Sequence, residues 1–446
     1  MKQRGRHRRR RRGAALRAVL AGTALALTAA ATLISASQAT VADDPGALKP
    51  LSSSAGTGAL RLQEHPVPAR SLDRLSSAMG GPVGVGTVLR SADRTLRESA
   101  DCGSEERESL PVAPVPTTAY CWDPADTAAT GWRPASVTTS GDADDDGLWG
   151  TDRVILAGWT HSTTSGPVHE RGLARVAFVD ADHPRHPSYR WVLLVVPVDE
   201  GRDYRGLTSP VSGMAWYGDK LLVTSGPKSA EALYVYDLNR IQRTSVDGPA
   251  VGRVPGGWSA DGYGYVMPAV ASYRFTAGRC AGTEHAAPCP GSLSLDRGTS
   301  PDSLVVAERT PAGGDRQSRL WRYSLSAVPA HGGPLATDAA GRVDAVDAYR
   351  TGAADIRGVL SYHPVGAARP TWYIAHPPRD LDGHGTLWAQ DADGARSARC
   401  GSDATRHCWA EEAGSLSYWP QTGEVWSVTD RMLFSLPLTA IDSSLG

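Results

Sequence analysis

Three short hydrophobic runs separated by polar turns follow one another between residues 212 and 238, in the stretch SGMAWYGDKLLVTSGPKSAEALYVYDL. The first run opens on a glycine and ends in aromatic residues, the second is LLVTS, and the third is LYVYDL. Runs of this length bounded by Gly, Pro, Asp and Ser are typical of β-strands joined by turns. A chain that repeats such a unit is restricted to folds in which each unit packs against its neighbours.

The unit recurs along the chain. The first runs lie at 135–139, 213–217, 291–295, 358–362 and 414–418, the second at 153–160, 220–225, 303–308, 371–376 and 424–429, and the third at 173–179, 232–238, 319–325, 386–390 and 433–438. Fourth runs are visible at 189–198 and 263–275. Five consecutive units of three to four antiparallel strands predict an all-β fold, a five-bladed β-propeller. Six blades and a β-sandwich are the alternatives.

Details of the runs favour the propeller. The second runs are continuously apolar, as expected for strands covered on both faces by neighbouring blades. Small residues open the first runs, which indicates crowding around a central channel. The last unit stops after its third run, and TTAYCW at 117–122 is placed to supply the strand that completes it.

The N-terminus has the pattern of a secretory signal peptide. Residues 1–12 carry eight Lys or Arg side chains, an apolar stretch follows, and Ser-Gln-Ala closes it at 37–39. We predict a signal peptide over 1–39, with cleavage after Ala42 as the alternative, and a secreted, extracellular protein. Residues 40–116 are poor in large apolar groups and are predicted to form a partly ordered arm. The propeller domain is assigned to 117–446.

Removal of the signal peptide makes the protein acidic. Residues 1–39 contain nine of the 46 Lys and Arg residues and none of the 47 Asp and Glu residues, so the remaining chain has a net charge of −10. This charge disfavours nucleic acids as partners. No other run approaches the ~20 apolar residues of a membrane helix, so no stable membrane insertion is expected after cleavage. We expect a monomer.

Six cysteines remain in an exported chain, which predicts disulfide bonds. Fifteen pairings are possible in principle. The separations within sequential pairs are short, 19, 9 and 8 residues, and favour three local bridges. These are Cys102–Cys121, Cys280–Cys289 and Cys400–Cys408.

Several stretches resemble a group of secreted proteins from actinobacteria. They are YCWDPAD (120–126), WRPASVTTSGDAD (132–144), RVILAGW (153–159), YRWVLLVVP (189–197), SGMAWYGDKLLV (212–223), LYVYDLNRI (233–241) and SLDRGTSPDSLVVAE (294–308). The resemblance covers most of residues 117–440. It implies a propeller-like fold and export, and it implies no activity.

A candidate calcium loop lies in GDADDDGLWGTD at 141–152. Asp142, Asp144 and Asp146 occupy alternate positions and a glycine follows, which matches the first half of a calcium-binding loop. The second half departs from that pattern, although Asp152 is placed to substitute for the missing glutamate. The alternative is a solvated acidic turn. No other cofactor is predicted.

Charged residues precede several first runs, and in a propeller these starts converge at one mouth of the channel. The candidates are Asp355, Arg357, Glu411, Glu412 and Arg133. Glu411, Glu412 and Asp355 are candidate catalytic carboxylates, and Arg133 and Arg357 are candidate ligand-binding residues. Two carboxylates about 5–9.5 Å apart can act as acid and base on a sugar. The alternative is a rim of salt bridges.

Two functional classes are therefore expected. The first is a binding or interaction module for a polar extracellular ligand, which would be a carbohydrate, a cell-wall component or a protein. The second is an extracellular hydrolase or lyase of the glycoside type that uses the carboxylates at the mouth. No complete catalytic motif is present in a supporting context, which favours the binding module.

Overall fold

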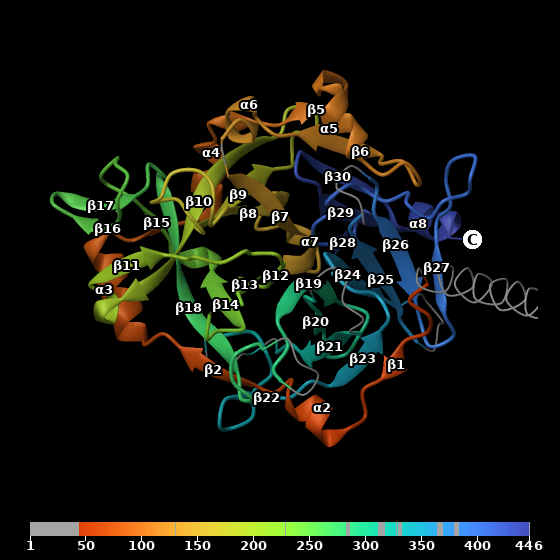
Figure 1. Ribbon diagram of the computed structural model, residues 1–446. Coiled ribbons are helices and arrows are strands. Elements are labelled where there is room, and N and C mark those ends of the chain that lie inside the picture. The colour runs from red at the N-terminus through yellow and green to blue at the C-terminus, as the bar shows by residue number, and fades with distance from the viewer. Residues whose placement is uncertain are drawn as a thin grey trace, which may run out of the picture. The chain divides into compact units, whose positions relative to one another are not determined.

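The computed structural model describes residues 44–445, apart from 130, 228, 282–285, 311–316, 327, 329–331, 364–368 and 379–382. The predicted signal peptide therefore lies outside the described residues. From Gly46 onward the chain forms one unit. Strands predominate in it, and the repeat seen in the sequence forms antiparallel sheets (Figure 1).

Each repeated unit runs in chain order from an inner to an outer strand. The first contains β7 (Trp132–Thr139), β8 (Val154–His161), β9 (Ala174–Asp180) and β10 (Ser188–Val198), and the second β12 (Met214–Tyr217), β13 (Lys220–Thr224), β14 (Leu233–Asp237) and β18 (Tyr265–Phe275). The third contains β19 (Pro290–Asp296), β20 (Ser303–Glu308), β21 (Ser318–Ser324) and β23 (Asp347–Thr351). The fourth contains β24 (Gly358–Tyr362), β25 (Thr371–His376), β26 (Thr386–Gln390) and β27 (Ala395–Ser397). The last begins with β28 (Ser417–Trp419), β29 (Glu424–Val428) and β30 (Met432–Pro437).

The last unit is completed from the other end of the repeat region. Strand β6 (Thr118–Cys121) pairs antiparallel with β30, and β5 (Arg97–Glu98) then pairs with β6. The prediction that 117–122 supplies the missing strand is confirmed. The outer strands β10 and β18 of the first two units also pair in parallel, which joins these units into one fourteen-stranded sheet.

The first strands β7, β12, β19, β24 and β28 lie at the centre of the arrangement, which is propeller-like (Figure 1). A Cβ atom on Gly213 would lie 2.6 Å from the backbone nitrogen of Leu293, and one on Gly414 would lie 2.7 Å from the carbonyl oxygen of Ala135. Neighbouring first strands therefore approach closely at these glycines, as their small size predicted. Bulky side chains such as Trp321 and Trp372 are fully buried between sheets.

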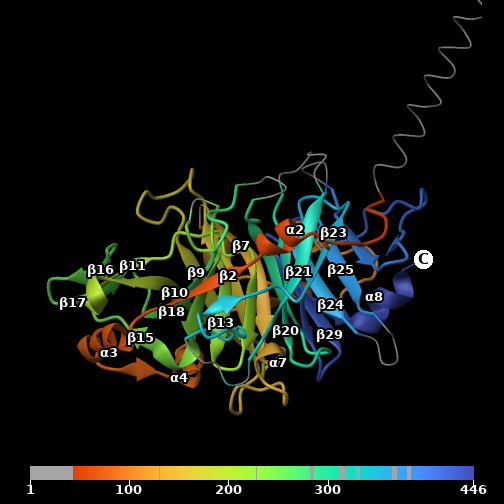
Figure 2. The same ribbon diagram turned by 90° about the horizontal axis from the view of Figure 1, so that it is seen from below.

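Residues 44–116 run along the outer edges of the sheets (Figures 1 and 2). This segment contains β1 (Lys49–Pro50), α2 (Ser54–Gly58), β2 (Leu62–Pro66), α3 (Ala69–Ala78), β3 (Pro82–Val83), α4 (Val85–Arg90), β4 (Arg94–Thr95), β5, η1 (Ser99–Asp101) and α5 (Ser104–Glu108). Strand β1 extends the third unit, and β2 pairs with β18 of the second. Apolar side chains of the segment such as Leu62, Leu75 and Val88 are buried, whereas Val112 and Val115 near its end are exposed. These contacts make the segment an ordered belt around the sheets.

Shorter elements decorate the repeat. They are α6 (Pro124–Thr127), α7 (Ser140–Ala143), η2 (Asp199–Gly201), β11 (Asp203–Gly206), η3 (Leu238–Arg240), β15 (Ile241–Arg243), β16 (Val251–Val254), β17 (Gly257–Ala260), β22 (Arg342–Val343) and α8 (Leu438–Ser444). Residues 240–262 form an insertion between β14 and β18, and this insertion contains the hairpin β16–β17. None of the helices that the structure describes is long and apolar enough to cross a membrane.

The three predicted disulfides are confirmed: Cys102–Cys121, Cys280–Cys289 and Cys400–Cys408. The first connects η1 to the closing strand β6. Three disulfides indicate an oxidising environment.

Candidate binding site at the channel mouth

Two adjoining pockets lie where the chain enters the first strands. One has a volume of about 340 Å³ and the other of about 280 Å³. They share Pro210, Ser212, Arg309 and Arg357 on their walls. The structure therefore brings the starts of several first strands together at one mouth, which is the place where the charged candidates were expected.

Asp355 and Arg357 form an ion pair on the wall of the larger pocket. The Nε atom of Arg357 lies 3.2 Å from Oδ1 of Asp355, and its guanidinium also donates a hydrogen bond to Oδ2. The backbone nitrogen of Asp355 donates to Oγ1 of Thr310. Because Arg357 already contacts both oxygens of the Asp355 carboxylate, this carboxylate is less available to take a proton from a ligand.

The backbone is left-handed at three similar points of this mouth. Val211, Asp355 and Glu412 have φ of 26°, 47° and 43°, and each lies two or three residues before the glycine of a first run. Non-glycine residues rarely adopt this conformation, and residues that do so cluster at ligand sites. The turns redirect the chain from the rim into the central strands.

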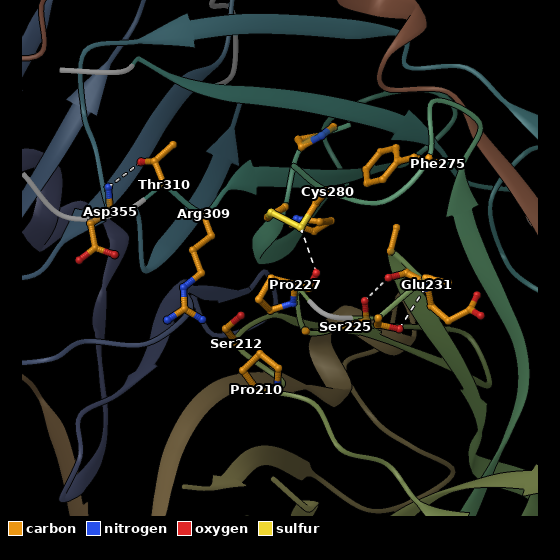
Figure 3. Close-up of a pocket in the computed structure, with 18 of the residues that line it drawn as sticks. Pro210, Ser212, Ser225, Pro227, Glu231, Phe275, Cys280, Arg309, Thr310 and Asp355 are labelled. Atoms are coloured by element: carbon orange, nitrogen blue, oxygen red, sulfur yellow. Dashed lines mark hydrogen bonds between the residues drawn. A yellow bond between two sulfur atoms is a disulfide. The ribbon is translucent and has the colours of Figure 1, made fainter. Parts of the chain in front are cut away.

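Arg309 is a second cation on the wall of the larger pocket. Its guanidinium points into the pocket between Asp355 and Ser212 (Figure 3). Within the part of the chain that the structure describes, no hydrogen bond or ion pair engages this guanidinium. Desolvation and the neighbouring Arg357 lower the pKa of Arg309, whereas Asp355 opposes the change. An incoming acceptor or anion would relieve both effects.

The smaller pocket contains a second ion pair and a carboxylate without one. Nε of Arg133 lies 3.4 Å from Oδ2 of Asp430. Burial raises the pKa of the Asp430 carboxyl; Arg133 opposes this rise and Glu412 adds to it. The Glu412 side chain is exposed on the pocket wall and has no ion-pair or hydrogen-bond partner among the described residues. The pocket thus offers an acceptor beside a weakly acidic carboxyl.

The larger pocket also has an apolar wall. Phe275 and the Cys280–Cys289 disulfide lie opposite Arg309 with several prolines (Figure 3). Glu231 lies in the same wall, but Arg274 binds both of its carboxylate oxygens. The pocket therefore combines an apolar face with a polar end, as sites for small ligands do.

Four of the five charged candidates line these pockets: Asp355, Arg357, Glu412 and Arg133. Glu411 does not. The backbone nitrogen of Glu411 donates a hydrogen bond to the carbonyl oxygen of Ser109 in the belt. The negative charge of Glu411 contributes to raising the pKa of Arg431.

Sequence reasoning missed Arg309 and Asp430, although a signal was present. Each directly follows a second run, SLVVAE and EVWSVT. Because first and second strands are antiparallel, the end of one lies beside the start of the other. Polar residues just after second runs therefore reach the same mouth, as Arg309 does beside Gly291.

The four carboxylates of the proposed calcium loop are not brought together. Asp142 is buried, and its Oδ2 accepts hydrogen bonds from Thr138 and Ser417. Asp144 and Asp146 accept from backbone nitrogens of their own turn, and Asp152 accepts from Thr151. None of the four belongs to a group of converging metal ligands in the described residues. Asp144, Asp146 and Asp152 thus lie in a polar turn, whereas Asp142 is a buried hydrogen-bond acceptor between central strands.

Comparison with known proteins finds no matching family model and no matching curated protein. A gluconolactonase from Xanthomonas campestris is similar in structure at 12% identity and a TM-score of 0.30, over 78% of this chain and 99% of that chain. Drosophila Plexin A in complex with Semaphorin 1b, and Drosophila Semaphorin 1b itself, are similar at 10% identity and a TM-score of 0.23, each over 68% of this chain and 78% of that chain. Scores this low carry no functional argument.

Proposed function

We propose that this protein is a secreted five-bladed β-propeller that binds a carbohydrate at the mouth of its central channel. The five inner strands and the closing strand β6 support the blade count. The leader pattern of residues 1–39 and the three disulfides support export.

One observation favours this function above others. Among the described residues, Arg309 and Glu412 have no ion-pair partner, whereas the other charged side chains of the mouth form the pairs Arg133–Asp430 and Arg357–Asp355. The hydroxyl groups of a sugar both donate and accept, so they match one free donor and one free acceptor better than an ion would. The apolar wall around Phe275 suits the C–H face of a sugar ring, which packs against apolar surfaces.

The test is a screen of the protein on a glycan array, repeated with Arg309→Gln. This substitution removes the charge and the forked donor but keeps a polar side chain. We expect the variant to lose at least about tenfold in affinity, corresponding to one charge-assisted hydrogen bond of roughly 1.5–3 kcal/mol. Arg185→Gln, a change at an exposed arginine outside both pockets, is the matched control and should bind normally. Equal binding by all three proteins would place the ligand elsewhere.

A second candidate, glycoside hydrolysis, is favoured by Asp430. Its raised pKa is a property of a general acid, and Glu412 beside it is placed as the base. In this reading the pair is Asp430 and Glu412, rather than Asp355 or Glu411. Release of reducing ends from array ligands by the native protein, lost in Glu412→Gln while binding persists, would establish hydrolysis. Retention of intact glycans would establish binding alone.

A further inference from the structure

A second group of converging side chains lies away from the two pockets. His169 and Glu170 belong to the loop between β8 and β9, and Asp261 follows β17 in the insertion. The Nε2 atom of His169 lies 3.2 Å from Oδ1 of Asp261 and 3.8 Å from Oε1 of Glu170. All three potential ligand atoms lie within 4.8 Å of one another.

Glu170 is held in place by buried groups outside this cluster. Its Oε2 accepts a hydrogen bond of 3.0 Å from the indole nitrogen of Trp132 and lies 3.3 Å from Nε2 of His161. Both Trp132 and His161 are buried. The other oxygen, Oε1, is therefore turned toward His169. Metal-binding carboxylates are commonly oriented in this way, through hydrogen bonds to the oxygen that does not bind the metal.

The third member of the cluster, Asp261, has a largely buried carboxylate. Its side chain is only 6% exposed, and its backbone is left-handed, with φ of 55°. Across the described ranges, His169 is the one group that forms an ion pair or hydrogen bond with its carboxylate. A buried carboxylate next to another carboxylate is costly unless a positive charge lies between them.

We propose that His169, Glu170 and Asp261 bind one divalent transition-metal cation of the zinc type. Zinc bound to nitrogen and oxygen at about 2.0–2.2 Å in tetrahedral geometry places its ligand atoms about 3.4 Å apart. The separations of 3.2 and 3.8 Å are close to this value. An imidazole among the ligands favours zinc over calcium or magnesium, which prefer oxygen alone.

This site would have a structural consequence. The loop after β8 and the insertion carrying β16 and β17 are far apart in sequence, and the metal would connect them. The His169 side chain is 48% exposed, so water can occupy the fourth position. The ring of His161, which contacts Glu170, also lines the smaller pocket at the mouth.

The experiment is a calorimetric titration of untagged, chelator-treated protein with zinc chloride and, separately, calcium chloride. We expect one saturable zinc site per chain and no saturable calcium binding. His169→Ala and Asp261→Asn should each weaken zinc binding at least tenfold. His183→Ala is the matched control, because His183 is an exposed histidine that pairs with the carboxylate of Asp180 at 3.7 Å and belongs to no group of three converging ligands in the described residues. It should leave zinc binding unchanged.

Far-ultraviolet circular dichroism of each variant checks that the fold is retained. Two outcomes would overturn the proposal. If the native protein binds no zinc, the cluster is an ion-pair group in which His169 alone bridges the acids. If folded His169→Ala binds zinc as the native protein does, the metal lies at another site.

Discussion

At the scale of single residues, Asp142 shows why a sequence motif and a structural role can differ. Its Oδ2 accepts hydrogen bonds of 2.7 Å from Thr138 and 2.6 Å from Ser417, and Thr138 Oγ1 in turn accepts from the backbone nitrogen of Trp216. One carboxylate thereby connects first strands β7, β28 and β12 at the centre. Burial raises its pKa; the hydrogen bonds from Ser417 and Thr138, then Arg297, limit this rise.

This environment predicts a pH-dependent effect of Asp142→Asn. A folded-state pKa above the unfolded value means that the stability Asp142 provides is complete below the unfolded pKa and is lost as pH rises through the folded pKa. Asparagine does not titrate. The free energy of unfolding of the variant, measured in urea, should therefore improve relative to the native protein as the pH rises above about 4, the ordinary pKa of an aspartate. Parallel curves over this range would show that Asp142 has no raised pKa.

At the scale of elements, the packing of first strands depends on glycine. A Cβ on Gly414 would lie 2.7 Å from the carbonyl oxygen of Ala135 in β7 and 2.7 Å from Cγ2 of Val428 in β29. Neither atom can move freely, because the first is backbone of the central strand β7 and the second belongs to a fully buried side chain. The repeat of small residues at the starts of first runs is therefore a requirement of the close approach between units.

We accordingly expect Gly414→Ala to destabilise the protein by about 1–3 kcal/mol, the usual cost of overpacking a rigid site. Gly394→Ala is the control, since a Cβ there meets nothing within 4 Å and its φ is not left-handed. That variant should stay within about 0.5 kcal/mol of the native protein. Denaturant unfolding measures both. A Gly414→Ala variant as stable as the control would mean that the central strands can separate.

At the scale of the whole molecule, the ring of sheets is closed by a strand from the opposite end of the repeat region. Strand β6 pairs with β30, and the Cys102–Cys121 disulfide fastens β6 to the belt. Loss of this strand would expose the edge of β30 in the last unit.

We predict that replacing Cys102 and Cys121 together by serine lowers the free energy of unfolding by about 3 kcal/mol, from the entropy of a loop of 19 residues. Replacing Cys400 and Cys408, which close a loop of 8 residues, should cost about 2.5 kcal/mol at most. Denaturant unfolding of the two double variants and of the native protein, in one series, measures both losses. A smaller loss at Cys102–Cys121 than at Cys400–Cys408 would show that β6 does not control closure.

The inner and middle strands of the sheets could be predicted from the sequence. Strands β24, β25 and β26 coincide with the runs at 358–362, 371–376 and 386–390. Burial on both faces makes such strands continuously apolar, and that signal is local. The outer strands β23 and β27 were missed, because a strand at the periphery has few buried side chains and is mostly polar. The disulfides were predicted because their partners are close in sequence.

The sequence by itself determined the all-β repeat, the position of the closing strand and the edge at which charged residues gather, since each depends on the order of short local patterns. Only the tertiary structure decided which charges pair and which stay free. Arg309 and Glu412 come from different units. His169 and Asp261 lie 92 residues apart in the chain (261 − 169). The belt of residues 44–116 was likewise unpredictable, because its short strands are stable only when added to sheets formed by distant segments. Contacts of this kind exist once the ring has closed, and no local pattern encodes them.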